Sequence, residues 1–390
     1  MNWKNAVAKE GNIYDIPTNW LQIHYYDALN ILFRFENILR IFVYIVLKNK
    51  FGSKWMDCSI EENGKTIGTI EAIAKRRLSQ ENNMGYISYL IKCPIMQLTA
   101  GELVSLVLSE SNWCIFKDHF SGSKEVIRSK LLEVIEVRNA LAHFRPIKSE
   151  DVQLVKLNLN HLFMKIEKYL NTMTNINTVI PSNCSDKWYC SFNNISTEHC
   201  KVHAFESINK KWIRLSMVYE STILFEKEYR KNWNIRNLSL NTPQILKDYQ
   251  SLCDNVIFIT ELVPNVNIKA EIGKIRKNIN FTFSIESINK DEHISEGFTS
   301  LFQKIEEETA MIIEEITAQG KYVQSVQSKA VKYSDDGAWY FDDSGMKCEV
   351  SEDAVFEYWG DLSFDTEIIS NTSKYPWMPL NITPDDDIPF

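Results

Sequence analysis

The chain has 390 residues, of which 44% are hydrophobic, 12% aromatic and 24% charged, and it holds only 13 glycines and 10 prolines. This composition excludes a fibrous or largely disordered protein, and the length predicts two or three domains. The net charge of −8 is uneven, since residues 1–170 carry 22 lysines and arginines against 18 acids and the remainder carries 21 against 33. A polyanion is therefore expected at the N-terminal part, whereas the acidic half suits a protein or small-molecule partner.

Cysteine usage and hydropathy predict a cytoplasmic protein. The eight cysteines are scattered without a dense framework, and the first residues contain no apolar signal core. The longest apolar run, ILRIFVYIVL at residues 38–47, includes Arg40 and is shorter than the roughly 20 residues that a membrane-spanning helix needs. We therefore expect no membrane span.

The first 170 residues show helical periodicity, joined by mostly short loops. Gly52 is placed to end the first helix, Thr99 and Glu102 have the spacing of a capping box, and Pro146 stops the fourth helix. These features predict an all-α bundle. The expected helices cover residues 20–50, 66–80, 98–110, 121–143 and 149–170.

The first of these helices is unusually apolar but carries a polar face. At 100° per residue the polar side chains fall within an arc of about 160°, opposite an apolar face. Such a face is expected to meet water, a partner or a cleft. The polar set is Arg34, Glu36, Asn37, Arg40 and Tyr44, and the apolar set is Leu32, Leu39, Phe42 and Ile45.

The second half of the chain has a different pattern. Residues 173–187 are rich in Asn, Thr and Ser and predict a linker, after which strands are expected at 188–196, 200–207, 212–221, 255–262 and 278–287 and a helix at 296–320. Residues 321–390 form an acidic, aromatic-rich segment whose Trp339, Trp359 and Trp377 are interpreted as core or interface anchors. The fold class predicted is α+β: a helical domain at 1–172, the linker, a β-rich mixed domain at 188–320 and the acidic segment.

The stretch EVIEVRNALAHFRPIK at residues 133–148 contains the side chains best suited to chemistry. Arg138 presents a planar cationic fork that matches phosphate oxygens, and His143 can exchange a proton near neutral pH. RNA supplies its own nucleophile, the 2′-hydroxyl, so such a pair needs no metal ion to cleave it. Asn139 is a candidate to orient the imidazole or bind phosphate, and Arg145 and Lys148 extend the positive surface.

The spacing of the pair raises a geometric question. Five residues on an ideal helix place two side chains about 140° apart, so Arg138 and His143 share a face only if the helix loosens or the arginine reaches round. Pro146 favours loosening, because it disfavours helical geometry at Arg145.

The motif Arg-Asn-x-x-x-His, near the end of the penultimate helix, resembles the R-x(4–6)-H signature of the HEPN superfamily. The first helix is similar to that of Swt-like and abortive-infection HEPN domains, and the resemblance covers roughly residues 17–170. It implies a metal-independent endoribonuclease that dimerises across a shared cleft, in which Arg138 contacts the scissile phosphate, His143 is the general acid or base and Asn139 supports them. The segment between the first helix and the motif helix is longer than in minimal members.

Other interpretations remain open beside this one. Arg138 could simply pair with Glu133 or Glu136, with His143 favoured by the helix dipole. Arg34 and Arg40 are further candidates for RNA phosphate, or Glu36 and Asn37 could orient the opposite motif of a dimer. One cluster is metal-like but poorly spaced for zinc, so no metal site and no cofactor are predicted. That cluster comprises Cys184, Cys190, His199, Cys200 and His203.

The sequence therefore predicts a cytoplasmic endoribonuclease effector, in phage defence or a toxin-like stress response, that cleaves RNA, with tRNA as one possible target. The expected partners are a second copy through the helical domain and a trigger or regulatory protein at the C-terminal half. The alternative is a non-catalytic HEPN dimer that scaffolds a protein or nucleotide. A DNA-acting enzyme is disfavoured, since no set of metal-binding carboxylates is visible.

Overall fold

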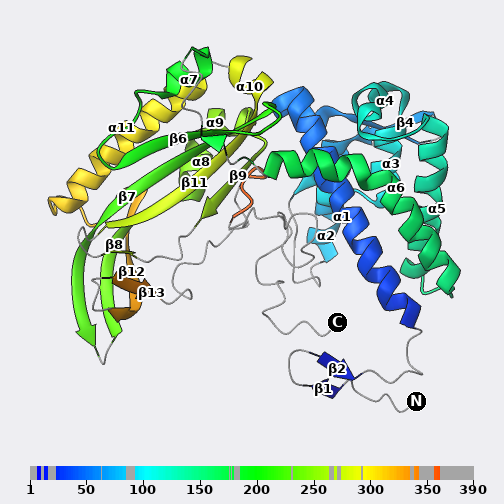
Figure 1. The fold of residues 1–390 in the computed structure, drawn as a ribbon, viewed down its shortest axis with the longest axis horizontal. Coiled ribbons are helices and arrows are strands. Elements are labelled where there is room, and N and C mark those ends of the chain that lie inside the picture. Colours follow the sequence, from blue (N-terminus) through cyan, green and yellow to red (C-terminus); the bar gives the residue numbers. More distant parts are fainter. Residues whose placement is uncertain are drawn as a thin grey trace. The chain divides into compact units, whose positions relative to one another are not determined.

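A computed structural model shows a mixed α+β protein with its main helices in the N-terminal half and its large sheet in the C-terminal half, which confirms the predicted fold class (Figure 1). Cys184 and residues 361–390 lie outside the part of the chain that the structure describes, which is residues 7–9, 13–15, 23–62, 64–84, 93–174, 176, 178–179, 185–229, 232–262, 268–269, 274–290, 293–333, 338–341 and 355–360.

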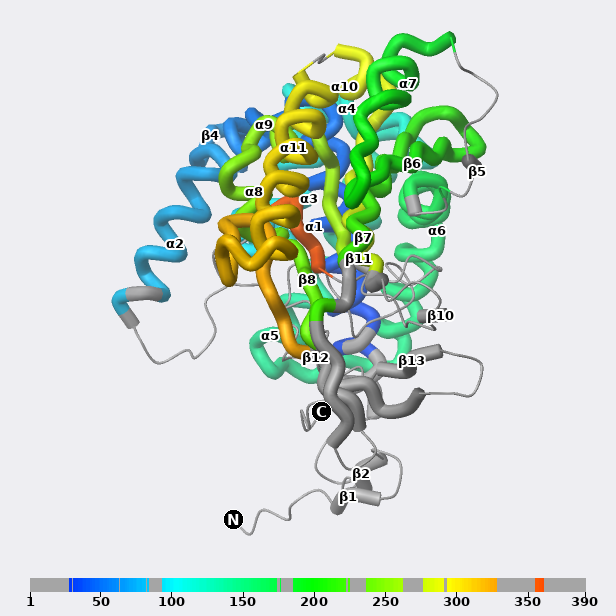
Figure 2. The backbone as a smooth tube through the Cα atoms, turned by 90° about the vertical axis from the view of Figure 1, so that its left-hand side faces the viewer, coloured from blue at the N-terminus to red at the C-terminus, as the bar shows by residue number. Residues whose placement is uncertain are grey.

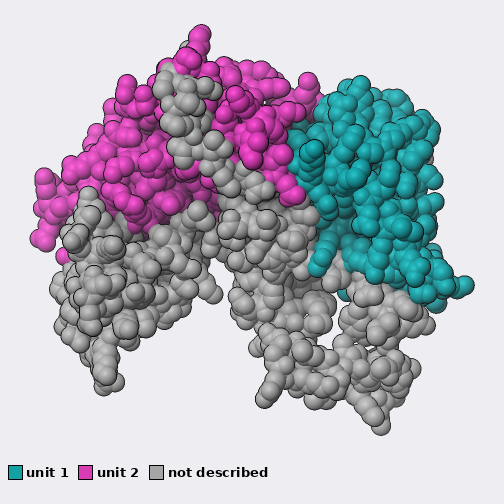
Figure 3. Space-filling model, viewed as in Figure 1, with its two compact units in different colours: residues 1–46, 59–74, 98–169 teal, residues 47–58, 75–97, 170–390 magenta. Residues whose placement is uncertain are grey.

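The chain divides into two compact units (Figure 3). Unit 1 comprises residues 1–46, 59–74 and 98–169, and unit 2 comprises residues 47–58, 75–97 and 170–390. The helical part of the chain thus ends near residue 170, while two of its segments are grouped with the β-rich part.

The N-terminal half contains the expected helices with shifted ends. The helix predicted at 66–80 begins later, because residues 59–69 form a hairpin, so this half is not entirely helical as predicted. The helices are α1 (Ile23–Phe51), α2 (Ile70–Met84), α3 (Ala100–Leu108), α4 (Glu110–Phe116), α5 (Lys124–Ala142) and α6 (Ser149–Thr174), with 3-10 turns η1 (Gly52–Asp57), η2 (Pro94–Gln97) and η3 (Lys117–His119). The strands are β1 (Val7–Lys9), β2 (Ile13–Asp15), β3 (Ser59–Glu62) and β4 (Lys65–Thr69).

Helix α1 is the centre of the core of unit 1. Its apolar face is buried as predicted, and so are Asn37 and Tyr44 from the face that was expected to be polar. The Phe35 ring stacks on Phe163 of α6 at 5.7 Å, and Phe42 meets Phe116 of α4 edge to face at 5.7 Å. The polar residues of α1 therefore lie inside the bundle rather than along an open stripe.

Capping residues define the starts of α3 and α5. Thr99 and Glu102 form the predicted capping box at the start of α3, and Ser123 caps α5 by accepting a hydrogen bond from the Val126 amide. Helix α1 ends at Phe51, before Gly52, whose φ of 58° suits a residue without a Cβ.

Unit 2 is built on a nine-stranded sheet with the path β10-β13-β12-β8-β7-β11-β9, with β6 also paired to β7 and β5 to β6. All these pairs are antiparallel, and β7 is long enough to pair with β6 and β11 over its first part and with β8 over its second. The strands are β5 (Thr178–Val179), β6 (Cys200–Glu206), β7 (Trp212–Tyr229), β8 (Asn232–Leu240), β9 (Phe258–Leu262), β10 (Ile268–Lys269), β11 (Lys274–Ser284), β12 (Val323–Tyr333) and β13 (Ala338–Phe341).

One face of this sheet packs against α11, as the ribbon view and the tube view show (Figures 1 and 2). Alternate residues of β7 point to that face, and Phe281 of β11 meets Phe298 of α11 edge to face at 5.0 Å. Residues 188–196 were predicted as a strand, but the structure has α7 there. The helices of unit 2 are α7 (Lys187–Phe192), α8 (Thr242–Asp248), α9 (Gln250–Asp254), α10 (Ile285–Lys290) and α11 (His293–Ile313).

Two parts of the predicted acidic segment belong to this unit. Strand β12 lies inside the sheet next to β8, and residues 357–360 run beside β9. There Trp359 is buried and its ring stacks on Phe258 at 4.4 Å, which places it in the core as interpreted from the sequence. Trp377 lies outside the described residues, and the side chain of Trp339 is not described.

Candidate functional site

Helix α5 is anchored by its apolar side and carries the Arg-Asn-x-x-x-His motif at its end. Ile127, Leu131 and Val134 are fully buried, at spacings that place them on one side of the helix. Leu132 lies on the other side of the helix and is 47% exposed. The buried side fixes the helix against the bundle and leaves its last turns at the surface.

The helix does loosen at His143. Ala142 is its last helical residue, His143 has a φ of −98° and a ψ of 14°, and Phe144 has a positive φ of 55°. The Phe144 amide donates to the Leu141 carbonyl at 3.0 Å and the Arg145 amide to the Ala140 carbonyl at 2.8 Å. This pair of bonds is a Schellman motif, which turns the chain away from the helix axis directly after His143.

Arg138 is held by a residue from the first helix. Its Nε donates to Oε2 of Glu36 at 3.1 Å, and the two side chains are 30% and 12% exposed respectively. The sequence suggested Glu133 or Glu136 as the partner, yet Glu133 accepts a hydrogen bond from Asn158 of α6 at 2.6 Å. Since only Nε is used, the two terminal Nη groups of Arg138 have no hydrogen-bond partner among the described residues.

Glu36 bridges two arginines. Its Oε1 pairs with Nη2 of Arg40, which also donates to the Leu98 carbonyl at 3.1 Å, while Nη1 of Arg40 donates to Oδ1 of Asn37 at 3.1 Å. One carboxylate therefore faces two guanidinium groups, which leaves a local excess of positive charge. Arg40 is occupied by these contacts, so within this structure it supports the network rather than presenting an open fork.

The remaining predicted residues lie at different depths. Asn139 is half-buried and its backbone carbonyl accepts from the His143 amide at 3.1 Å, while His143, Arg145 and Lys148 are exposed. Arg34 is half-buried, and its Nε is buried without a hydrogen bond in the described part of the chain. In that part no hydrogen bond or ion pair joins Arg138 to His143, so the two share a helix end without direct contact.

Among the residues that the structure describes, the cysteines and histidines of the predicted metal-like cluster do not converge on one site, and Cys184 lies outside those residues. His199 precedes β6 and binds Glu306 of α11, with Nδ1 2.7 Å from Oε1, while Cys200 is buried and His203 is exposed on the strand. Burial raises the pKa of the Cys200 thiol, which keeps it protonated. Glu198, His199 and Glu306 bring potential ligand atoms within 4.8 Å of one another, but the histidine and Glu306 already satisfy each other.

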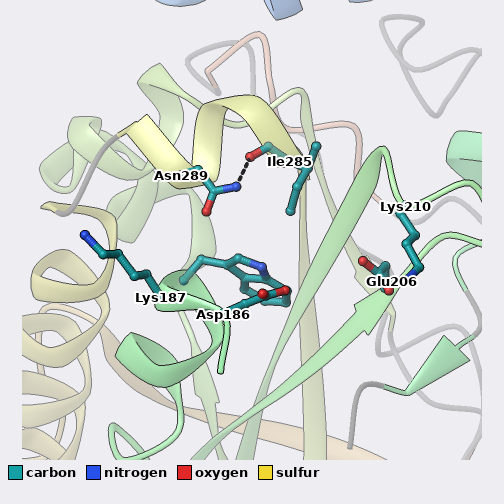
Figure 4. A pocket seen from close by; sticks show the side chains of 7 residues that line it. Asp186, Lys187, Glu206, Lys210, Ile285 and Asn289 are labelled. Atoms are coloured by element: carbon teal, nitrogen blue, oxygen red, sulfur yellow. Dashed lines mark hydrogen bonds between the residues drawn. The ribbon is translucent and has the colours of Figure 1, made fainter. Parts of the chain in front are cut away.

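Unit 2 also has a surface pocket of about 580 Å³ near α7 and α10 (Figure 4). Its rim carries charges of both signs, and Asn289 donates to the Ile285 carbonyl at 2.9 Å. The mixed charges and wide opening do not specify one class of ligand. It is lined by Asp186, Lys187, Trp188, Glu206, Lys210, Ile285 and Asn289.

Comparison of the chain with models of protein families, with curated proteins and with solved structures finds no match. Among the described residues, none of the helices combines the length and the apolar character that crossing a bilayer requires.

Sequence reasoning missed two features of this site. Glu36 was considered only as a residue that could orient the opposite motif of a dimer, whereas it binds Arg138 of its own chain. Phe144 lies inside the motif stretch and was passed over, although the structure gives it a positive φ and leaves it 89% exposed. The signal available for Phe144 was its place between His143 and Arg145, where an aromatic residue lies between two residues with basic side chains.

Proposed function

We propose that unit 1 is a HEPN-type, metal-independent endoribonuclease whose active site contains Arg138 and His143. The observation that supports this most directly is the Glu36–Arg138 contact. It fixes the guanidinium through Nε and leaves the two Nη groups for a phosphate, at the same helix end where His143 is exposed. Asn139, Arg145 and Lys148 add polar and positive groups to that end of the helix.

These groups match the chemistry of RNA cleavage. The 2′-oxygen forms a bond to phosphorus while the bond from phosphorus to the 5′-oxygen breaks, which gives a 2′,3′-cyclic phosphate and a free 5′-hydroxyl. His143 takes the proton from the 2′-hydroxyl or gives one to the leaving 5′-oxygen, and Arg138 stabilises the charge that develops on the phosphate oxygens. The proton lost at one oxygen is balanced by the proton gained at the other.

The proposal includes a homodimer, in which the motif of a second copy supplies the groups that one motif lacks. Such a nuclease would act as an effector in phage defence or a toxin-like stress response, with the acidic β-rich half receiving a trigger or a regulatory protein. The uneven charge of the chain supports this division, because RNA would meet the more basic N-terminal part.

A non-catalytic binding module is the second candidate, and the surface of α6 favours it. Leu154, Leu157 and Met164 are exposed and fall within an arc of about 80° on the helix, which is an apolar strip that a partner protein could cover. In that case the Arg138 network would be structural, and substitution of His143 would have no effect on the activity in cells.

The decisive experiment is cleavage of total RNA and tRNA by the purified full-length protein in EDTA, with analysis of the product ends. We expect 2′,3′-cyclic phosphate ends from the wild type and a loss of cleavage of at least about 100-fold in His143→Ala and Arg138→Ala. Arg128→Ala on the same helix and His203→Ala on β6 are matched controls, since both side chains are exposed outside the motif. Cleavage that persists in His143→Ala and Arg138→Ala would refute the assignment.

Expression in a bacterial host separates the two candidates without purification. Growth arrest that disappears with His143→Ala, while the variant still accumulates, supports the nuclease. Growth arrest that is indifferent to His143→Ala and Arg138→Ala supports the binding module, and in that case Leu157→Asp on the α6 strip should abolish it.

A further inference from the structure

Phe144 has an unusual conformation for its residue type. Its φ of 55° lies in the left-handed region, where the Cβ crowds the backbone, and this position of a Schellman motif is commonly glycine. The other described non-glycine residues with positive φ are Lys210 and Glu315, both with charged side chains. An aromatic residue at this position is therefore not explained by the needs of the turn.

The side chain of Phe144 is also not explained by packing. It is 89% exposed, whereas Phe35 and Phe42 of the bundle are fully buried. The described part of the chain gives its ring no aromatic or cation–π partner. The strained backbone and the exposed ring add no stability to the fold. They therefore indicate that Phe144 contacts another molecule.

The neighbours of Phe144 indicate which molecule that is. His143 precedes it and Arg145 follows it, both exposed, and Lys148 lies three residues further on. An aromatic ring flanked by cations is the combination that binds single-stranded nucleic acid, because a base stacks on the ring while the cations hold the backbone. A base paired inside a duplex offers no such free face.

We propose that Phe144 stacks on an unpaired nucleobase next to the scissile phosphate, so that the substrate is single-stranded RNA. This inference rests on the proposed ribonuclease function and specifies its substrate. The Cα atoms of His143 and Phe144 are about 3.8 Å apart, so a base on the ring belongs to a nucleotide adjoining the phosphate that His143 serves. The turn after Ala142 fixes the backbone that carries the ring before RNA arrives, which reduces the backbone ordering needed on binding.

The test is RNA binding by full-length protein carrying His143→Ala, which prevents cleavage during the measurement. Fluorescence anisotropy with a labelled 12-nucleotide single strand is compared with the same sequence in a duplex. We expect Phe144→Gly to weaken binding of the single strand about ten-fold, Phe144→Trp to preserve it, and both to leave binding of the duplex unchanged. Ile208→Gly is the matched control, because Ile208 is exposed to a similar degree at a hairpin of unit 2.

Each contrary outcome has its own meaning. Equal binding of the single strand with and without Phe144→Gly overturns the stacking role, even if Arg138→Ala and His143→Ala abolish cleavage and so support the nuclease. Loss of binding that accompanies a change from dimer to monomer, measured by light scattering, overturns it as well and assigns the ring to a contact with a second copy. If the wild-type chain neither binds nor cleaves RNA, the proposed function is refuted together with this inference.

Discussion

Glu36 and Arg138 are 102 residues apart in the sequence, yet Oε2 of Glu36 lies 3.1 Å from Nε of Arg138. Glu36 also pairs with Arg40, so the first helix and the motif helix share one polar network in the bundle. A hydrogen bond to a charged group in a partly buried place is stronger than one in open water. The network therefore fixes the position of the Arg138 guanidinium.

Glu36→Gln tests this positioning role. The amide keeps the shape but loses the charge, so we expect kcat for RNA cleavage to fall about 10-fold to 100-fold while KM changes little, because misplaced groups act mainly on the transition state. Steady-state kinetics on a defined oligonucleotide measures both. Glu133→Gln is the control, since Glu133 binds Asn158 instead. An equal fall of kcat in both variants would show a general structural effect rather than a specific one.

Phe144→Gly should stabilise the protein although it removes a large side chain. Glycine adopts positive φ without crowding, and the exposed ring contributes almost no buried area, so we expect the free energy of unfolding to rise by about 1 kcal/mol. Urea denaturation measures the change. Phe144→Ala should give no comparable gain, since alanine keeps the Cβ that causes the strain. A clear loss of stability in Phe144→Gly would show that the ring packs in solution.

The buried ion pair of unit 2 offers a direct test of its core. Nζ of Lys48 lies 2.6 Å from Oε1 of Glu357 and 3.1 Å from the Cys253 carbonyl, and the two charged side chains are 1% and 6% exposed. Lys48→Met should cost about 3–5 kcal/mol of unfolding free energy, because Glu357 is left charged and buried without a partner.

A second substitution distinguishes a lost charge from lost packing. Lys48→Met combined with Glu357→Leu should recover most of that loss, since neither buried charge remains. Lys124→Met is the control, because its partner Glu110 is 90% exposed and such pairs contribute at most about 1 kcal/mol. Equal losses in Lys48→Met and Lys124→Met would contradict the buried pair.

Local rules in the sequence predicted part of this structure. Thr99 and Glu102 start α3 through the predicted capping box, and Gly52 follows the last residue of α1; both signals act within a few residues and can be recognised without knowledge of the fold. The hairpin at residues 59–69 was missed although its signal was present, since the sequence Asn-Gly at 63–64 separates β3 from β4. Residues 188–196 were wrongly predicted as a strand because aromatic side chains favour strands. The structure has the short helix α7 there, which buries Trp188 and Phe192.

The site was harder to predict for a physical reason. Glu133 and Glu136 lie five and two residues from Arg138, outside the spacing of three or four residues that helical ion pairs need, but nothing local shows that the tertiary fold brings Glu36 to Arg138 instead. The conformation of Phe144 depends in the same way on where the helix ends. The sequence can identify candidate groups, but the partner that orients each one is selected by packing over long distances.

Acid should weaken the contact between β6 and α11. Burial alone would raise the pKa of Glu306, but hydrogen bonds from His199 and Thr197 outweigh it and lower the pKa below its ordinary value of 4.5. A carboxyl whose pKa is lowered in the folded state adds stability above that ordinary value, and the stability is lost as the pH falls through the lower, folded-state value. The free energy of unfolding should therefore drop below about pH 4.5, and less steeply in Glu306→Gln, as urea denaturation at a series of pH values would show. Glu307→Gln, at an exposed position of the same helix, should follow the wild type, and an unchanged slope in Glu306→Gln would contradict the prediction.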